Sequence, residues 1–197
     1  MEVLAPARGA GAKAPRADAQ RNRDAILRAA RETFESDGVL ASLDGIAARA
    51  GVGNATLYRN FPTRDDLLAA VIQAGIEAAL AEADELSRTL SPRVALREWL
   101  ARLTWQLRIW HDLPSCIANA REDPESSMNA ACSPLIARTA VLLDAARSRG
   151  EVVEGVTADE VFELITALSW GVDRFHDDEA AARRRVDIAT AGVFTQD

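Results

Sequence analysis

The side chains best suited to chemistry lie in one short stretch, residues 51–64, which reads GVGNATLYRNFPTR. Five hydrogen-bonding side chains surround a single apolar anchor, Leu57: they are Asn54, Thr56, Tyr58, Arg59 and Asn60. Most short helices in a soluble domain bury an apolar stripe wider than this one. A helix that keeps so many donors and acceptors free is suited to contact a polar partner rather than to fill a core.

Two short predicted helices position this stretch, and they meet at Gly51. Ser42 can cap the first helix, over 42–50, and Pro62 ends the second, over 54–61. Gly51 allows the positive φ that a tight turn between them requires. Small or apolar residues occupy the positions where the helices must touch: Ile46, Ala47, Ala50, Val52 and Leu57. The spacing is typical of a helix-turn-helix, whose second helix reads the major groove of DNA.

The polar face of the second helix carries groups that match those of a DNA groove. Arg59 can bond a guanine or a phosphate, and Ala55 is short enough to let the helix approach closely. Ser42 and Arg64 begin the flanking helices, where they can reach the DNA backbone. The predicted DNA-binding residues are Ser42, Asn54, Ala55, Thr56, Tyr58, Arg59, Asn60 and Arg64. Two further arginines at the start of the lead helix, Arg21 and Arg23, are alternative backbone contacts.

Helical periodicity continues along the rest of the chain, and no strand alternation stands out. We therefore predict an all-α fold of about nine helices, with a three-helix N-terminal head and a larger C-terminal helical body. The expected division is a disordered arm over 1–17, a DNA-binding head over 18–64 and a body over 65–197. Within the body, residues 112–132 are expected to form a short helix plus loop, and Ser133 with Pro134 to start the next helix.

Composition limits the class of protein. The chain has 197 residues, 48% of them hydrophobic, and no apolar run long enough to cross a membrane. Two cysteines make no disulfide framework, so we expect a cytoplasmic protein. The net charge of −7 is uneven, because residues 1–61 carry nine Arg or Lys and seven Asp or Glu while residues 62–197 carry 14 and 23. A basic head on an acidic body is compatible with DNA binding.

Aromatic residues in the body suggest a small-molecule site. For any one of the four tryptophans, Trp99, Trp105, Trp110 and Trp170, packing in the core or at a dimer seam is the alternative. As a group they favour an apolar cavity with a few polar anchors. The predicted ligand-binding residues are Trp99, Leu103, Gln106, Arg138, Leu142, Phe162, Thr166 and Trp170.

Other reactive residue types lack the spacing that chemistry needs. His111 and His176 show no metal-binding pattern, and Cys116 and Cys132 are unpaired, so we expect neither a metal nor a redox switch. The basic run 183–185 lies beside acidic residues and is interpreted as a solvated face. No catalytic triad, phosphate loop or carboxylate pair is recognisable, so the sequence predicts no enzyme and no cofactor.

The segment LDGIAARAGVGNATLYRNFPTRDDLLAAVI resembles the DNA-binding region of the TetR family of transcriptional regulators. The family pattern is matched at Ile46, Ala47, Ala50, Gly51, Val52, Thr56, Leu57, Tyr58, Phe61, Arg64 and Leu67. Three positions depart from it: Gly53 stands where Ser is common, Asn60 where His is common, and Arg64 where Lys is usual. The resemblance covers residues 20–72.

This resemblance implies the roles of individual residues. Thr56 and Tyr58 would bind phosphates, and the base readers would be Asn54, Ala55, Arg59 and Asn60. It further implies a homodimer on palindromic double-stranded DNA, acting as a repressor that an unknown small-molecule effector releases. The helix from Thr63 would be the lever, and helices over 157–175 and 178–194 would form the seam. A ligand-dependent activator, and an interaction protein that keeps the head as a structural cap, are the alternatives.

Overall fold

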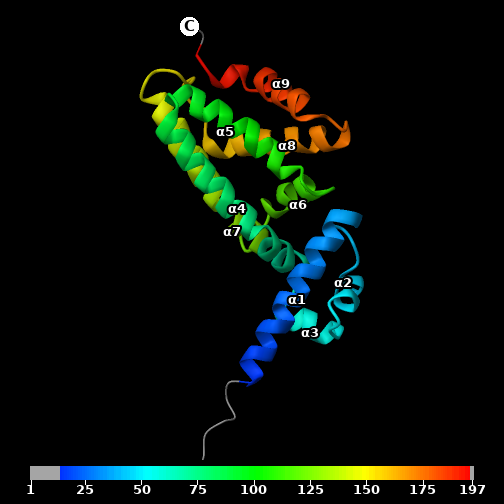
Figure 1. Ribbon diagram of the computed structural model, residues 1–197. Helices are drawn as coiled ribbons and strands as arrows, with labels where there is room; N and C mark the ends of the chain where they lie inside the picture. Colours follow the sequence, from blue (N-terminus) through cyan, green and yellow to red (C-terminus); the bar gives the residue numbers. More distant parts are fainter. Residues whose placement is uncertain (1–13, 196–197) are drawn as a thin grey trace, which may run out of the picture.

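The fold of residues 14–195, the part of the chain that the computed structural model describes, is helical throughout (Figure 1). Within these residues the only β pairing is an isolated bridge between Val152 and Phe194, and there is no sheet. The helices are α1 (Ala14–Asp37), α2 (Leu43–Arg49), α3 (Asn54–Asn60), α4 (Arg64–Thr89), α5 (Pro92–Leu107), α6 (Leu113–Ala120), α7 (Ser127–Arg147), α8 (Ala158–Arg174) and α9 (Glu179–Ala189), followed by a 3-10 turn (Ala191–Val193). The predicted all-α fold is confirmed.

Helices α1 to α3 form the head at one end of the molecule (Figure 1). Gly51 turns the chain between α2 and α3 with φ +70°, and no atom lies within 4 Å of the place where a Cβ would stand. Glycine is therefore required there by the backbone and not by crowding. Ser42 caps α2 as expected, since its side chain accepts from the backbone N–H of Gly45 at 3.4 Å. The head's core consists of Ile26, Phe34, Ile46, Leu57 and Phe61.

The lead helix begins at Ala14, four residues before the expected start at Asp18. Pro15 is its second residue, a position where the missing N–H and the fixed φ of proline suit a first helical turn. Part of the expected arm is therefore helical, while residues 1–13 lie outside the described residues.

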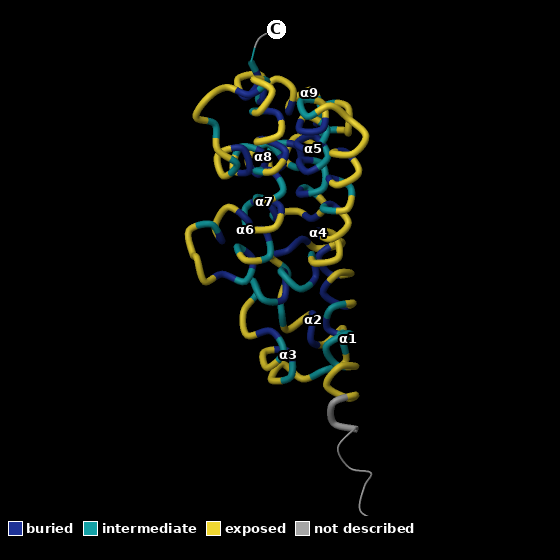
Figure 2. Tube along the Cα trace, turned by 90° about the vertical axis from the view of Figure 1, so that its left-hand side faces the viewer, coloured by how far each residue is buried: buried dark blue, intermediate teal, exposed yellow. Residues whose placement is uncertain are grey.

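Helix α4 leaves the head and runs the length of the body, packed along α7 (Figure 1). Its start is fixed by the predicted capping box, in which Thr63 and Asp66 satisfy each other's backbone N–H groups. Hydrogen bonds from the Ser127 and Thr63 side chains hold the pKa of Asp66 below its ordinary value. In the body, the buried parts of the trace run along the sides of the helices that face one another (Figure 2).

The start of α7 corrects one prediction. The helix begins at Ser127, not at Ser133, and Pro134 lies inside it. Ser126 caps the true start, because its Oγ accepts from the N–H groups of Met128 and Asn129 at 3.2 and 3.4 Å. Pro134 leaves one carbonyl of the previous turn without its helical donor, a tolerable loss on an exposed face. The first turn of α7 is held by the buried Met128 and by the buried Ser126 cap.

Helices α8 and α9 complete the body at the end far from the head (Figure 1). The predicted capping box of Thr157 and Glu160 begins α8, and α9 is shorter than expected, ending at Ala189. None of the described helices combines the length and the apolar character that a membrane span needs.

Candidate nucleic-acid interface and ligand cavities

Helix α3 divides into a packed side and a free side. Leu57 is buried in the head, whereas Asn54, Ala55, Tyr58 and Arg59 are exposed. Thr56 and Asn60 are half-buried at the border between the two sides. The predicted DNA-contacting residues of this helix therefore share one accessible surface at the end of the molecule, as a recognition helix requires.

The polar side chains of α3 bond to their own helix. Arg59 donates to the Ala55 carbonyl at 3.2 Å and to the Thr56 Oγ1 at 3.1 Å. Asn60 donates from Nδ2 to the Thr56 carbonyl at 2.8 Å. The two Arg59 bonds are exposed, so they compete with water and are readily exchanged for base or phosphate atoms.

Arg23 is occupied within the head. Its guanidinium lies 4.3 Å from the centre of the Phe61 ring, and its Nη1 donates to the Asn60 carbonyl at 3.3 Å. A cation at this point satisfies the C-terminal end of α3 and complements its dipole. Arg21 forms an exposed ion pair with Asp18 one turn away.

Arg64 connects α4 to the turn between α1 and α2. Its Nη1 donates to the carbonyls of Val39 and Ala41 at 2.6 and 2.8 Å. The side chain is half-buried, so these bonds fix the entry of α4 against the head. The sequence suggested a phosphate contact for Arg64, and this positioning contact was not foreseen because its acceptors lie about 25 residues away in the chain.

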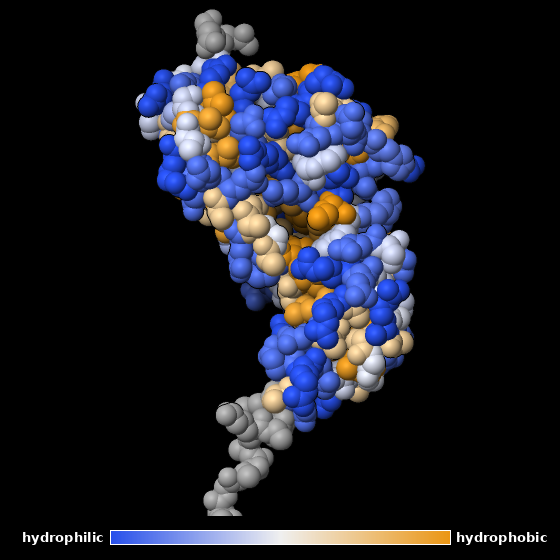
Figure 3. Space-filling view, in the orientation of Figure 1, coloured by the Kyte–Doolittle hydropathy of each residue, from blue (hydrophilic) through white to orange (hydrophobic). Residues whose placement is uncertain are grey.

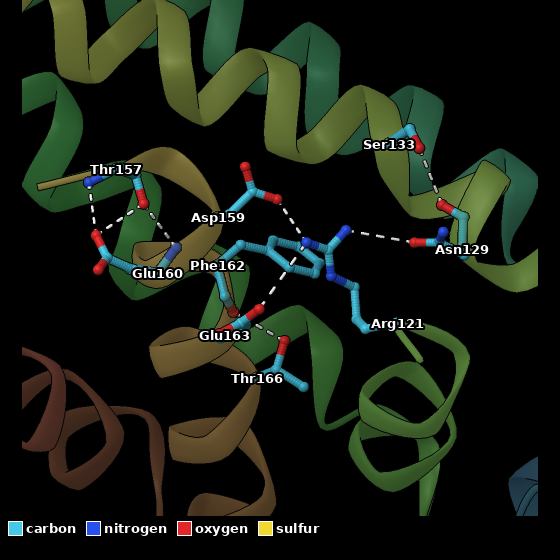
Figure 4. Close-up of polar contacts among 9 residues, drawn as sticks. All are labelled: Arg121, Asn129, Ser133, Thr157, Asp159, Glu160, Phe162, Glu163 and Thr166. Carbon is cyan, nitrogen blue, oxygen red and sulfur yellow. Dashed lines mark hydrogen bonds and ion pairs between the residues drawn. The ribbon is translucent and has the colours of Figure 1, made fainter. Parts of the chain in front are cut away.

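A larger cavity of about 630 Å³ lies between α6 and α8, and three of the predicted ligand-binding residues line it: Phe162, Thr166 and Trp170. Figure 4 shows its charged wall, where Arg121 reaches Asp159, Glu163 and Asn129. Because two carboxylates already face this guanidinium, the wall offers no free positive charge. Trp170 is 48% exposed at the rim.

A smaller inner cavity of about 250 Å³ lies among α4, α5, α6 and α7 and reaches Arg31 of α1. Figure 3 shows a hollow with hydrophobic atoms at its rim near the middle of the molecule, where α4 and the end of α5 lie in Figure 1. Two predicted ligand-binding residues line this cavity, Leu103 and Gln106. Its walls are otherwise mostly apolar, with Val71, Ile76 and Leu135 among them.

The other predicted ligand-binding residues line neither cavity. Trp99 is fully buried and donates from Nε1 to the Thr139 Oγ1 at 2.9 Å, Arg138 pairs with Asp84, and Leu142 is in the core. Trp110 was missing from the predicted set although it lines the inner cavity. The spacing of Leu103, Leu107 and Trp110 in the sequence, four and three residues apart, was the signal that identifies it, although α5 ends at Leu107 and Trp110 follows the helix.

Cys132 is buried and Cys116 is half-buried. The thiol of Cys132 lines the inner cavity, and loss of water contact raises its pKa to about 11. Burial also raises the pKa of Cys116. Thiolate is the reactive form, so neither position has the character of a redox site.

The segment that holds α8 and α9 carries three large exposed apolar side chains. Trp170 of α8, Phe175 just after it and Ile188 of α9 are 48%, 64% and 78% exposed. Exposed apolar side chains bind other proteins where they form one continuous patch.

A three-helix head with a free polar recognition helix defines a helix-turn-helix DNA-binding protein. Two family models match: residues 26–71 fit "Bacterial regulatory proteins, tetR family", and residues 91–194 fit "Transcriptional regulator SbtR-like, C-terminal domain". The second covers more than half of the chain, which therefore belongs to the TetR family of transcriptional regulators. It is a DNA-binding regulator and not an enzyme.

Solved structures agree with this assignment. A TetR regulator from Streptomyces coelicolor is 28% identical over 89% of this chain and 99% of its own, with a TM-score of 0.56. One from Mycobacterium vanbaalenii is also 28% identical, over 92% and 99%, with a TM-score of 0.51. The fold is shared with Thermus thermophilus FadR, a repressor solved with lauroyl-CoA, at 19% identity over 89% and 96%, with a TM-score of 0.64. Among curated proteins no match was found.

Proposed function

We propose that this protein is a cytoplasmic repressor that binds a palindromic operator as a homodimer and is released by a small-molecule effector. The observation that carries the proposal is the free polar face of α3, in which Leu57 is the single buried residue. Asn54, Ala55, Arg59 and Asn60 read base edges, while Thr56, Tyr58 and Ser42 bind phosphates. Arg64 supports this surface from the start of α4.

The dimer seam is formed by α8 and α9. The exposed Trp170, Phe175 and Ile188 become buried against the same residues of a second copy, as two-fold symmetry requires. Two heads on one dimer then present their recognition helices to successive major grooves, roughly 34–36 Å apart. This spacing is the reason to expect a palindromic operator.

The effector binds in the inner cavity of the body. Val71 and Ile76 of α4 form part of its wall, and α4 leads directly to the head, so a molecule that separates α4 from α5 and α6 shifts the two heads. The effector weakens DNA binding only to the extent that it binds more tightly to the conformer whose two heads are not spaced for successive major grooves.

Selection of bound sequences from a random duplex pool, at a stated salt concentration, tests the proposal. We expect a palindromic consensus with half-sites about one helical turn apart. Weak, salt-sensitive binding without a consensus contradicts sequence reading by the head. A reporter gene with the selected operator then separates repression, in which expression falls, from activation.

Arg59→Ala tests the recognition helix on that consensus. We expect a loss of roughly 1–3 kcal/mol in operator binding if Arg59 contacts a base. Arg88→Ala is the matched control, since Arg88 is an exposed arginine at the far end of α4 that pairs only with Glu85 nearby. If Arg59→Ala, Arg88→Ala and the unmodified protein bind the operator with equal affinity, Arg59 does not contact the DNA.

A further inference from the structure

The inner cavity contains one buried donor without an acceptor. Trp110 lines the cavity and is 4% exposed, and its Nε1 has no hydrogen-bond partner among the described residues. A buried indole N–H ordinarily finds a partner, because leaving it unpaired costs free energy. By contrast, Trp99 of α5 is also buried and donates to Thr139.

The other polar groups at the cavity wall also favour a guest molecule that carries a hydrogen-bond acceptor. Arg31 is the single charged residue among the described lining residues, and one of its nitrogens donates to the Val71 carbonyl at 3.1 Å. The Gln106 Nε2 donates to Glu82, which does not line the cavity, at 3.0 Å. No carboxylate belongs to the lining described here, so a cationic guest would find no counter-charge.

The volume sets the size of a guest that fits wholly inside the cavity. An engineered apolar cavity of about 150 Å³ holds one benzene, or about 25 Å³ for each carbon atom. At this ratio the 250 Å³ of the inner cavity corresponds to about ten non-hydrogen atoms. The apolar walls require most of these atoms to be carbon.

From these three observations we infer that the effector is a compact apolar molecule of about ten non-hydrogen atoms ending in an acceptor oxygen, and that the Trp110 Nε1 donates to this oxygen. The inference rests on the proposed function, since it names the ligand class of the same regulatory site. The acceptor is a carbonyl or a carboxylate, both of which suit the indole N–H, and a carboxylate also benefits from Arg31.

The same residue contacts the head, which gives the bound oxygen a direct effect on DNA binding. The Trp110 ring lies 5.7 Å, centre to centre, from the Phe34 ring of α1. The next residue, His111, accepts at its carbonyl from the Val39 N–H at 3.2 Å, in the turn between α1 and α2. A guest that moves Trp110 therefore moves the residues on which the head packs.

Titration calorimetry with three matched probes tests the ligand class. 3-Phenylpropanoate and 4-phenylbutan-2-one end in an acceptor oxygen, whereas 3-phenylpropylamine carries a similar body and ends in a cationic donor. We expect the two acceptor probes to bind and the amine to bind at least tenfold more weakly. Failure of both acceptor probes to bind at millimolar concentration, or equal binding of the amine, overturns the inference.

Trp110→Phe tests the donor, with Trp99→Phe as the matched control. Phenylalanine keeps a ring against Phe34 and removes the N–H, so affinity for the acceptor probes should fall about fivefold to tenfold, the value of one hydrogen bond. Trp99→Phe removes a partnered N–H outside the cavity and should leave probe affinity unchanged. Equal probe affinity of Trp110→Phe and the unmodified protein refutes the donor role.

Two further results keep this inference separate from the proposed function. Operator binding by the unmodified protein without ligand is measured on the same preparation, so a probe failure with intact operator binding rejects the ligand class alone. Lauroyl-CoA serves as a much larger probe. If it binds at least tenfold more tightly than both phenyl probes, the size limit is wrong.

Discussion

Replacement of Arg64 by alanine separates a positioning role from direct contact with DNA. The Arg64 Nη1 donates two short bonds, of 2.6 and 2.8 Å, to the carbonyls of Val39 and Ala41. A charge-assisted hydrogen bond contributes up to roughly 1.5–3 kcal/mol, and half-exposure and the shared donor atom reduce the pair to about 2 kcal/mol. We therefore expect Arg64→Ala to lower the melting temperature by about 4–8 °C.

The assay for DNA contact is the salt dependence of operator binding. Each phosphate contact adds about 0.9 to the slope of log affinity against log salt. If Arg64 only holds the α1–α2 turn against α4, affinity falls through poorer preorganisation of the head and the slope is unchanged. We expect this outcome because Nη1 is already committed to two carbonyls.

Arg88→Ala is the control for Arg64→Ala, because it removes the same charge from the other end of α4 and from a surface ion pair with Glu85. Its stability should stay within about 0.5 kcal/mol of the unmodified protein. A slope reduced by about 1.8 for the dimer, which is about 0.9 for each of its two Arg64 residues, with unchanged melting temperature for Arg64→Ala, refutes the positioning argument and restores a phosphate contact.

Three further predictions concern the turn, the cap and the buried thiol. Gly51→Ala should destabilise the protein by about 1 kcal/mol in urea denaturation, because φ is +70° while no atom obstructs the new methyl; an equally stable variant contradicts this. The pKa of Asp66 is lowered in the folded protein, so its stabilising effect is present above its unfolded pKa and is lost as the pH falls through its folded pKa. Asp66→Asn should therefore reduce the dependence of the free energy of unfolding on pH in acid. An unchanged dependence of stability on pH counts against the cap. Cys132 has a pKa of about 11, so it should react with iodoacetamide at pH 8 roughly 100-fold more slowly than an ordinary thiol. Mass spectrometry of the labelled peptide measures this rate. Fast labelling means that the inner cavity opens.

The features that the sequence predicted correctly are those that neighbouring residues determine. The turn at Gly51, the Ser42 cap and the boxes of Thr63 and Thr157 each depend on residues within four positions of one another. The exposed face of α3 was predictable for the same reason, since Leu57 is its single apolar anchor. Local hydrogen bonds and helical periodicity carry enough information for these elements.

The cavities could not be predicted in the same way, because each is formed by helices that the chain brings together from distant segments. Side chains of α1, α4, α5, α6 and α7 enclose the inner one. The predicted ligand-binding set mixed residues from both cavities with core residues such as Trp99, since all of them are apolar positions on helices. Periodicity shows that a face is buried and not whether it packs against protein or against a void.

The inner cavity has two structural connections to the head, and they act on different parts of it. Through Val71 and Ile76 it adjoins α4, which enters the head beside the recognition helix and is fastened there by Arg64. Through Trp110 and His111 it adjoins α1 and the turn that follows. Arg64 donates to the carbonyls of Val39 and Ala41, which both lie in that same turn. The two connections therefore meet within the three residues 39–41. A guest that displaces either wall of the cavity therefore strains the α1–α2 turn, and we expect Phe34→Leu to weaken effector release of operator while probe binding to the body persists.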